Sequence, residues 1–292
     1  MKKLHFQTSI GIVFLFLLIL TGCKKQSPPS PADGGKTRLS KVFLNGKLVS
    51  EYVYNETGRL RQVIFFNGFD STKTSSVDFE YDEKDRIKVY RGSLLNVLNS
   101  KRKVEIIYNG LGEIEKEIYK DTITNTNNNI YVEDHYDLTY ESVPNGRREI
   151  TVLKTSPGFP NRVLEKTVYS VHNSGPLFGN IAEVHEYENA TPSSPGMIRY
   201  SRYYRYSTDS PTNADINAAN PYTYAATYGW GIIKRSPNVP ITEILVDRAS
   251  NGETYYTTHR YMLDANNLII EDKEHEQYGS DPIWTYHYIE VR

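Results

Sequence analysis

The sequence has almost no cysteine, and the one cysteine it has, Cys23, lies near its beginning. A single thiol cannot form an internal disulfide, so the long remainder of the chain must fold without one. It also excludes zinc sites built from several cysteines. The thiol of Cys23 therefore calls for a different explanation.

The chain also has little net charge, since 34 basic residues are balanced by 35 acidic ones. This balance gives no electrostatic basis for binding nucleic acid, which we do not expect as a partner. Methionine and tryptophan are scarce, with 3 and 2 residues, whereas tyrosine occurs 24 times. Tyrosine favours half-buried strands, and no strong helical period is present, so the composition predicts an all-β protein.

Long hydrophobic runs are absent except for Ile10 to Leu20, which has 11 residues. Spanning a bilayer takes about 20 apolar residues, so this run has the length of the hydrophobic part of a signal peptide. Lys2 and Lys3 precede it, and Leu20-Thr21-Gly22-Cys23 follows. These four residues resemble the lipobox of bacterial lipoproteins. We therefore predict that residues 1–22 are a lipoprotein signal peptide and that Cys23 carries a lipid that attaches the protein to a membrane.

Residues 23–36 comprise the lipidated cysteine and a segment rich in Pro, Ser and Gly. This composition is typical of a flexible tether. The residue after the cysteine is Lys24, and by resemblance to bacterial sorting rules this favours the outer membrane. Both a periplasmic and a cell-surface orientation remain open. We expect residues 37–292 to form a single all-β domain.

A repeated unit is the most informative internal feature. Its pattern is Tyr-(Asn/Asp)-x-x-(Gly/Asp)-x-(Leu/Ile), and its first three copies are spaced 27 residues apart. Asn or Asp after the tyrosine hydrogen-bonds the backbone two residues on, and Gly or Asp at the fifth position tolerates a left-handed conformation. The copies are Tyr54 to Leu60, Tyr81 to Ile87 and Tyr108 to Ile114, with looser copies at Tyr140 to Ile150 and Leu263 to Ile269.

Each unit reads as the turn of a β-hairpin with alternating flanks. In the segment after Gly112, Ile114 and Ile118 are expected on one face, while Glu115 and Glu117 face water. Roughly 14 to 16 such segments follow from residue 38 onward, and open sheets beyond ~10 strands curl, split or close. We predict a large antiparallel meander of hairpins that forms a curled single sheet or incomplete barrel. A lipid-embedded porin is the rival geometry, against which the short strands and outward glutamates stand.

Two family resemblances follow from these residues. The unit Tyr54 to Leu60 resembles the YD repeat of the large Rhs and teneurin-type shells, although this chain is too short to build such a shell. The sequence is more similar to a family of Bacteroidota lipoproteins of unknown function with a porin-like β fold. Its lipobox, its hairpins, and the segments Tyr228-Gly229 and Ser236 to Ile244 carry this likeness. The resemblance implies a fold and a compartment, and it implies no activity.

Motifs for catalysis or metal binding are scarce. No His-Glu-x-x-His, Gly-x-Ser-x-Gly, P-loop or dinucleotide fingerprint occurs. His185-Glu186 and Glu274-His275-Glu276 could supply metal ligands only if strands converged, and exposed polar strand faces explain them more simply. We therefore predict no enzyme, no metal site and no cofactor.

Aromatic residues are the remaining candidates for a binding site. Exposed aromatic rings stack on sugars or anchor protein partners. We predict a non-catalytic binding or scaffolding module for a glycan or an envelope protein, acting through a Tyr-rich sheet face. The alternatives are a carrier of a lipid or other apolar ligand in the curled sheet, and a glycan-active hydrolase. The candidate residues are Tyr203, Tyr204, Tyr206, Tyr222, Tyr224, Tyr228 and Trp230.

Overall fold

The computed structural model describes residues 37–93, 100–124, 129–144, 146–158, 163–175, 178–188, 196–206, 240–248, 252–266, 268–277, 279 and 281–290. These residues form sixteen β-strands, and none of them lies in a helix that could cross a membrane. The predicted signal peptide and tether lie outside the described residues. The strands are β1 (Thr37–Leu44), β2 (Lys47–Tyr54), β3 (Leu60–Phe66), β4 (Lys73–Tyr81), β5 (Ile87–Gly92), β6 (Ser100–Tyr108), β7 (Ile114–Thr124), β8 (Asn129–Val143), β9 (Arg147–Thr155), β10 (Glu165–His172), β11 (Ile181–Glu188), β12 (Met197–Arg205), β13 (Thr242–Asp247), β14 (Glu253–Leu263), β15 (Ile269–Glu276) and β16 (Ile283–Glu290).

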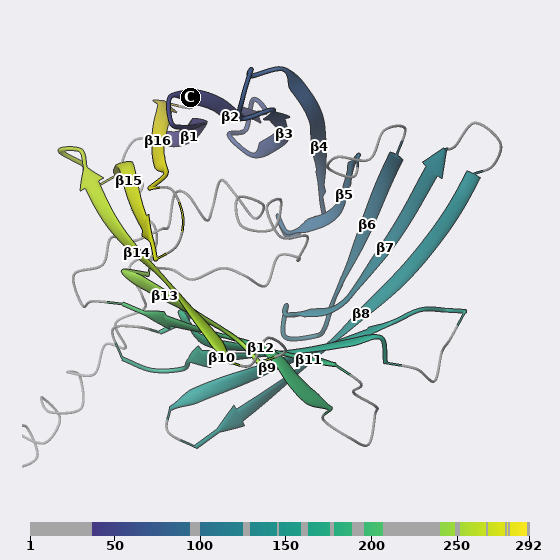
Figure 1. Cartoon of the computed structure of the whole chain (residues 1–292). Helices are drawn as coiled ribbons and strands as arrows, with labels where there is room; N and C mark the ends of the chain where they lie inside the picture. Colours follow the sequence, from purple (N-terminus) through teal and green to yellow (C-terminus); the bar gives the residue numbers. More distant parts are fainter. Residues whose placement is uncertain are drawn as a thin grey trace, which may run out of the picture. The chain divides into compact units, whose positions relative to one another are not determined.

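The strands form a closed antiparallel barrel in which each strand pairs with the next along the chain. The ring closes because β1 pairs with β16, from Thr37 opposite Glu290 to Leu44 opposite Trp284. Figure 1 shows these two strands side by side, although they stand at opposite ends of the colour scale. The predicted curled single sheet or incomplete barrel is therefore wrong. Closure pairs the backbone groups of both terminal strands, which an open sheet leaves unpaired at its edges.

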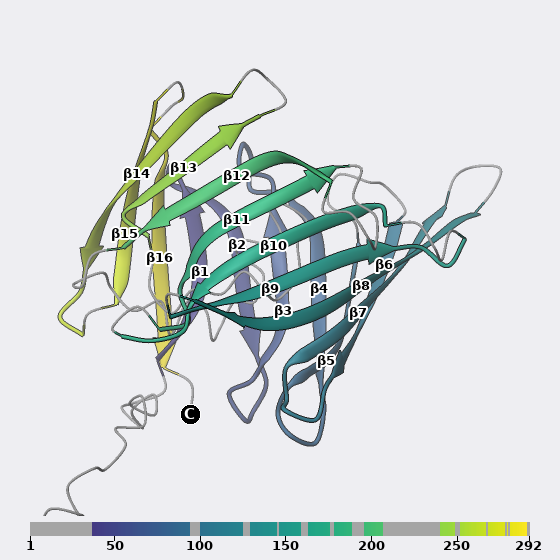
Figure 2. The ribbon, with the colours of Figure 1, turned by 90° about the horizontal axis from the view of Figure 1, so that it is seen from below.

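The hairpin turns alternate between the two ends of the barrel. The end that carries the turns of the repeated unit, at residues 55–59, 82–86 and 109–113, is called the tyrosine rim here. The strands run up and down between this rim and the opposite rim (Figure 2). Because β1 begins and β16 ends at the tyrosine rim, residue 37 also lies there.

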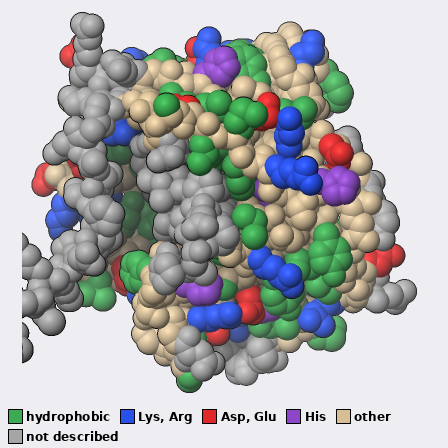
Figure 3. All heavy atoms as spheres, turned by 90° about the vertical axis from the view of Figure 1, so that its left-hand side faces the viewer, with side chains coloured by type: hydrophobic (Ala, Val, Ile, Leu, Met, Phe, Trp, Pro, Cys, Tyr) green, Lys and Arg blue, Asp and Glu red, His purple; other side chains and the backbone are tan. Residues whose placement is uncertain are grey.

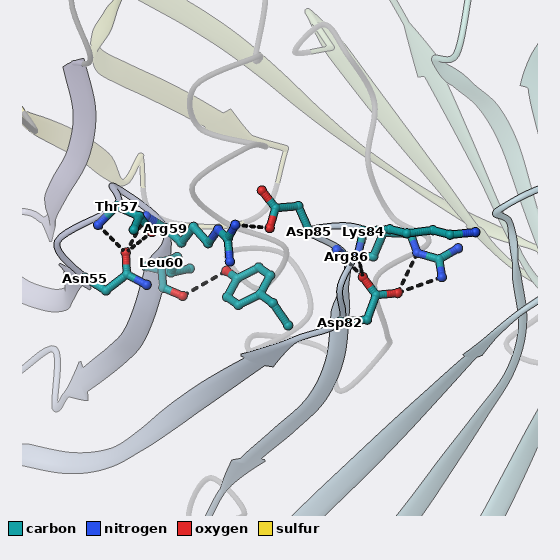
Figure 4. A network of polar contacts seen from close by, with 9 residues as sticks. Asn55, Thr57, Arg59, Leu60, Asp82, Lys84, Asp85 and Arg86 are labelled. Atoms are coloured by element: carbon teal, nitrogen blue, oxygen red, sulfur yellow. Dashed lines mark hydrogen bonds and ion pairs between the residues drawn. The ribbon is translucent and has the colours of Figure 1, made fainter.

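The predicted turn chemistry at the three clear repeats is confirmed. Asn55 Oδ1 accepts hydrogen bonds from the backbone N–H groups of Thr57 and Arg59, at 3.0 and 2.9 Å (Figure 4). Asp82 and Asn109 make the equivalent bonds in the next two copies. The fifth residue adopts a positive φ in every copy, 76° at Gly58, 65° at Asp85 and 82° at Gly112.

The tyrosine of each unit forms a hydrogen bond to the backbone of the preceding unit. Tyr81 Oη donates a hydrogen bond to the carbonyl of Leu60, and Tyr108 Oη donates to the carbonyl of Ile87. The guanidinium of Arg86 lies 4.0 Å from the centre of the Tyr108 ring, a cation–π contact. The same tyrosine-to-carbonyl bond joins seven hairpins of the described chain, made by Tyr54, Tyr81, Tyr108, Tyr140, Tyr206, Tyr261 and Tyr288.

Much of the inner wall of the barrel is apolar and rich in tyrosine, with a few charged groups among these side chains. Alternate residues of each strand point inward, and Leu39, Val63 and Val104 are completely buried there. The largest cluster of buried residues extends across β1 to β7. Its members are Leu39, Val42, Tyr52, Leu60, Val63, Val77, Phe79, Ile87, Tyr90, Val104, Ile106 and Tyr119.

One expected alternation is wrong in β7. A β-bulge shifts the register between β6 and β7, because Ile107 lies opposite Lys116 whereas Tyr108 lies opposite Ile114. The extra residue is Glu115, so the inward side changes from even to odd numbers after it. As a result, Glu117 is buried and accepts a hydrogen bond from Tyr119 at 2.9 Å.

Candidate functional site

The outer wall of the barrel is polar and charged. Lys116 of β7 pairs with Asp137 of β8 at 2.8 Å, and Lys120 pairs with Glu105 of β6 at 3.0 Å. Figure 3 shows charged side chains of both signs scattered over one face of the molecule. A cationic side chain facing lipid at the middle of a bilayer costs about 2–4 kcal/mol. This wall is therefore built to face water. Its cross-strand ion pairs include Lys41–Glu51, Glu80–Arg91, Lys120–Glu105 and Lys116–Asp137.

The structure splits the predicted tyrosine cluster between the two walls. Tyr204 points inward and is partly buried, and the removal of its phenol from water raises the pKa of that group well above the ordinary value. Tyr206 also points inward, and its hydroxyl donates to the carbonyl of Ile181 at 2.8 Å. Tyr203 points outward. The other predicted residues, Tyr222, Tyr224, Tyr228 and Trp230, lie outside the described part of the chain.

Tyr203 belongs to a row of side chains across three strands of the outer wall. It lies directly opposite Ile244 of β13, and Ile244 lies directly opposite Tyr256 of β14. We call Tyr203, Ile244 and Tyr256 the outer tyrosine row. The exposed fraction of Tyr256 is 46%. Sequence reasoning missed Tyr256 because it sits beside Tyr255, and the alternation alone does not tell which of the two faces out.

A polar network holds an imidazole against this row. The ring of His185 on β11 packs edge-on against the Tyr203 ring, with centroids 5.9 Å apart and planes at 77°. His185 Nδ1 lies 3.0 Å from the hydroxyl of the buried Ser201, and its Nε2 lies 3.3 Å from Glu183. Glu183 in turn is ion-paired with Arg147. These bonds hold the imidazole in place beside the Tyr203 ring.

A second cluster lies on the inner wall, where β13, β14 and β15 run side by side. We call Glu243, His259, Asp272 and Glu274 the inner acidic cluster. The side chains of His259 and Asp272 are only 5% and 7% exposed, and His259 Nδ1 lies 3.0 Å from Asp272 Oδ2. His259 Nε2 lies 3.7 Å from Glu243 Oε1. The Tyr261 ring stacks on the imidazole, with centroids 5.8 Å apart.

Burial and mutual charge shift the pKa values in this cluster. Burial by itself lowers the pKa of His259, but the hydrogen bond and charge of Asp272, with the charges of Glu243 and Glu274, outweigh it and raise that pKa. Burial, together with the neighbouring carboxylates, disfavours the charged form of Glu274 more strongly than the nearby His259 favours it. The pKa of Glu274 is raised to about 7.

Sequence patterns indicated only one member of this cluster. Glu274 stands in the run Glu274-His275-Glu276, but His275 points outward and lies 2.8 Å from Asp281. His185 and Glu186 point to opposite walls of β11, as neighbours in a strand must. The actual partners of Glu274 come from β14 and β13, at distant positions that only the strand register brings together.

Comparisons with known proteins reveal weak structural likenesses. A porin-like protein from Bacteroides vulgatus ATCC 8482 is similar over 78% of this chain and 97% of its own, with 12% identity and a TM-score of 0.46. A porin-like protein from Bacteroides uniformis ATCC 8492 covers 74% and 97%, with 13% identity and a TM-score of 0.23. No protein-family profile and no curated protein matches the sequence.

A third likeness is to the Photorhabdus luminescens Tc holotoxin pore, over 85% of this chain and 13% of that one, with 14% identity and a TM-score of 0.33. Two of the three similar structures thus carry the porin-like description that the sequence resemblance named. None of the three assigns a function to residues of this chain. Membership of a lipoprotein family and of the YD-repeat proteins stays a prediction.

Proposed function

We propose that this protein is a non-catalytic lipoprotein of the cell envelope whose barrel faces water and binds a glycan through the outer tyrosine row. The lipid on Cys23 would hold it at the outer membrane, and the segment 24–36 would tether the barrel. The observation that carries the proposal is the alignment of Tyr203, Ile244 and Tyr256 on neighbouring strands of a polar wall.

The size and chemistry of the row favour a glycan over a protein partner. Neighbouring strands lie about 4.8 Å apart, so the two tyrosines stand about 10 Å apart, a span that suits a short oligosaccharide. Aromatic faces stack on sugar rings, and the imidazole of His185, held by Ser201 and Glu183, packs edge-on against the Tyr203 ring and supports it. A stable protein interface needs about 800 Å² on each partner, far more than three side chains supply.

The charged outer wall supports a tethered domain and argues against a channel in the bilayer. The ion pair Lys120–Glu105 lies in the inner part of β6 and β7, away from the strand ends, where a porin presents an apolar band. The inner wall gives little support for a lipid carrier, because its apolar residues are already covered. Leu39, Val63 and Val104, for example, have exposed fractions of 0%.

Binding of labelled protein to an array of bacterial and host glycans tests the proposal, followed by calorimetry with the retained oligosaccharide. We expect Tyr203→Ala and Tyr256→Ala each to weaken binding by about tenfold or more, since stacking and anchor contacts are worth 1–2 kcal/mol or more. Thr258→Ala is the matched control, because Thr258 is also exposed on the outer face of β14.

Two outcomes contradict the proposal. One is an array that retains no folded protein, and the other is an affinity that neither tyrosine substitution changes. Capture of an envelope protein that depends on Tyr203 and Tyr256 would instead assign the row to protein binding. Lipidation is tested separately, by mass spectrometry of the native chain and of Cys23→Ala, which should lose the lipid and its membrane attachment.

A further inference from the structure

We propose that the inner acidic cluster binds a divalent transition-metal ion. His259, Asp272 and Glu274 each offer one ligand atom, and these atoms lie within 4.8 Å of one another. Glu243 extends the set from the neighbouring strand, with its Oε1 3.7 Å from His259 Nε2. One imidazole and three carboxyl groups from three strands thus lie together on the inner wall, with Asp272 on the Nδ1 side of the His259 ring and Glu243 on its Nε2 side.

Unpaired buried atoms point to a missing ligand. His259 Nε2 and Asp272 Oδ1 are both buried, and neither has a hydrogen-bond partner in the described part of the chain. Their side chains are more than nine-tenths buried, so water cannot readily satisfy them. A buried polar atom without a partner costs free energy unless an ion or another group completes it.

The hydrogen bond between His259 and Asp272 prepares the imidazole for a metal. A histidine that donates its Nδ1–H to a carboxylate keeps its lone pair on Nε2, which is the usual arrangement of a metal-binding histidine. Here Nδ1 lies 3.0 Å from Asp272 Oδ2, and Nε2 is the atom that lacks a hydrogen bond. The bond therefore directs the free nitrogen of His259 toward Glu243.

Carboxyl groups outnumber the imidazole in the cluster. Three of them, from Glu243, Asp272 and Glu274, surround His259. Arg202 of β12 acts electrostatically on Glu243, but its guanidinium is paired with Glu186 at 2.7 Å. A divalent ion would offset the remaining negative charge in a buried site, where uncompensated charge is costly.

The donor set indicates the kind of metal. Imidazole with carboxylates suits Zn²⁺, Mn²⁺ or Fe²⁺, whereas Ca²⁺ and Mg²⁺ prefer sites made of oxygen alone. The ligands come from β13, β14 and β15, so the ion would bind these three strands to one another. We infer a structural ion, because the side chains of His259 and Asp272 are only 5% and 7% exposed.

Metal analysis of the purified full chain tests the proposal. The protein is stripped with a chelator, dialysed against Zn²⁺ or Mn²⁺, and its metal content and affinity are measured by mass spectrometry and calorimetry. We expect one ion per chain and a higher unfolding temperature with metal, since a ligand that binds only the folded state stabilises it. Asp272→Asn and Glu274→Gln should each weaken binding by about 10–100-fold or more.

Glu271→Gln is the matched control, because Glu271 lies on the outer face of the same strand and pairs with Lys273 at 3.2 Å. It should bind metal as the unchanged chain does. Circular dichroism establishes that each variant is folded, and visible spectra of the unchanged chain with Co²⁺ report the ligand set without any substitution. The proposal is overturned if the unchanged chain binds no ion at micromolar metal, or if His275→Ala abolishes binding while Asp272→Asn does not.

Discussion

The hydroxyl of Tyr108 donates a hydrogen bond of 2.9 Å to the carbonyl of Ile87, 21 residues earlier in the chain. Tyr108 ends β6 and Ile87 begins β5, so this bond joins one repeated unit to the previous one at the tyrosine rim. The Arg86 guanidinium covers the same ring. The tyrosine that precedes each turn therefore also links neighbouring hairpins through a hydrogen bond.

Tyr108→Phe tests this bond directly. The substitution keeps the ring and removes the hydroxyl, which leaves the part-buried carbonyl of Ile87 without this donor. We expect the free energy of unfolding to fall by about 1 kcal/mol, the usual net value of such a hydrogen bond. Chemical denaturation measures it. Tyr131→Phe is the control, because Tyr131 is 74% exposed and should show almost no change.

Gly58→Ala tests the left-handed position of the repeat. Gly58 has a φ of 76°, which a residue with a Cβ adopts at a cost of about 1–2 kcal/mol. We therefore expect a loss of stability of this size in denaturant titrations. Gly110→Ala offers the comparison, since a Cβ at Gly110 meets nothing within 4 Å and its φ is not positive. Equal losses in the two variants would contradict the explanation.

Asp82 should make the barrel sensitive to acid. The backbone N–H of Arg86, followed by the Arg86 side chain and the N–H of Lys84, stabilises its carboxylate, and together they lower its pKa below the usual value. Because the folded-state pKa is the lower one, this stabilisation is present above the unfolded-state pKa, about 3.9, and is lost as the pH falls through the folded-state value.

Asp82→Asn removes this dependence and keeps the turn, because asparagine fills the same position at Asn55 and Asn109. At neutral pH we expect the variant to be nearly as stable as the unchanged chain. Below about pH 4 its unfolding temperature should fall less steeply with pH. Parallel acid titrations followed by circular dichroism would show whether the two curves differ.

Asp121→Ala tests an ion pair on the inner wall. Arg102 Nε and one terminal nitrogen contact the two carboxylate oxygens of Asp121 at 2.8 and 2.7 Å, and Asp121 is only 12% exposed. Removing the carboxylate leaves a half-buried guanidinium without its partner, so we expect a loss of about 2–3 kcal/mol. The outer pair Lys41–Glu51, with its N···O distance of 3.7 Å, supplies the comparison: Glu51→Ala should cost less than about 1 kcal/mol.

Local features of the barrel could be predicted from the sequence, whereas long-range ones could not. The turns at Asn55, Asp82 and Asn109 follow from side-chain hydrogen bonds that span only a few residues. The direction of Glu117 was predicted wrongly, because a bulge at Glu115 is a property of two paired strands and leaves no mark in one of them. Closure of the barrel could not be predicted for the same reason, because nothing within β1 or β16 alone specifies which strand pairs with it.

The candidate sites also combine local features, which the sequence predicts, with contacts that depend on strand pairing. Tyr203 was singled out as a surface aromatic, but its neighbours Ile244 and Tyr256 depend on the register of β12, β13 and β14. His259 and Asp272 each occupy an ordinary alternating position, and only the pairing of β14 with β15 brings them together. Sequence patterns specify which wall of a strand is polar, and strand pairing specifies which polar groups meet.

The seam between β1 and β16 sets the order of events during folding. Its two strands lie at opposite ends of the domain sequence, so the ring cannot be completed before β16 has been synthesised. Until then the backbone of β1 remains available to any other extended peptide. Contacts between such distant segments also form slowly. Loss of β16, which is 8 residues long, would leave this stage permanent and yield a protein prone to aggregation.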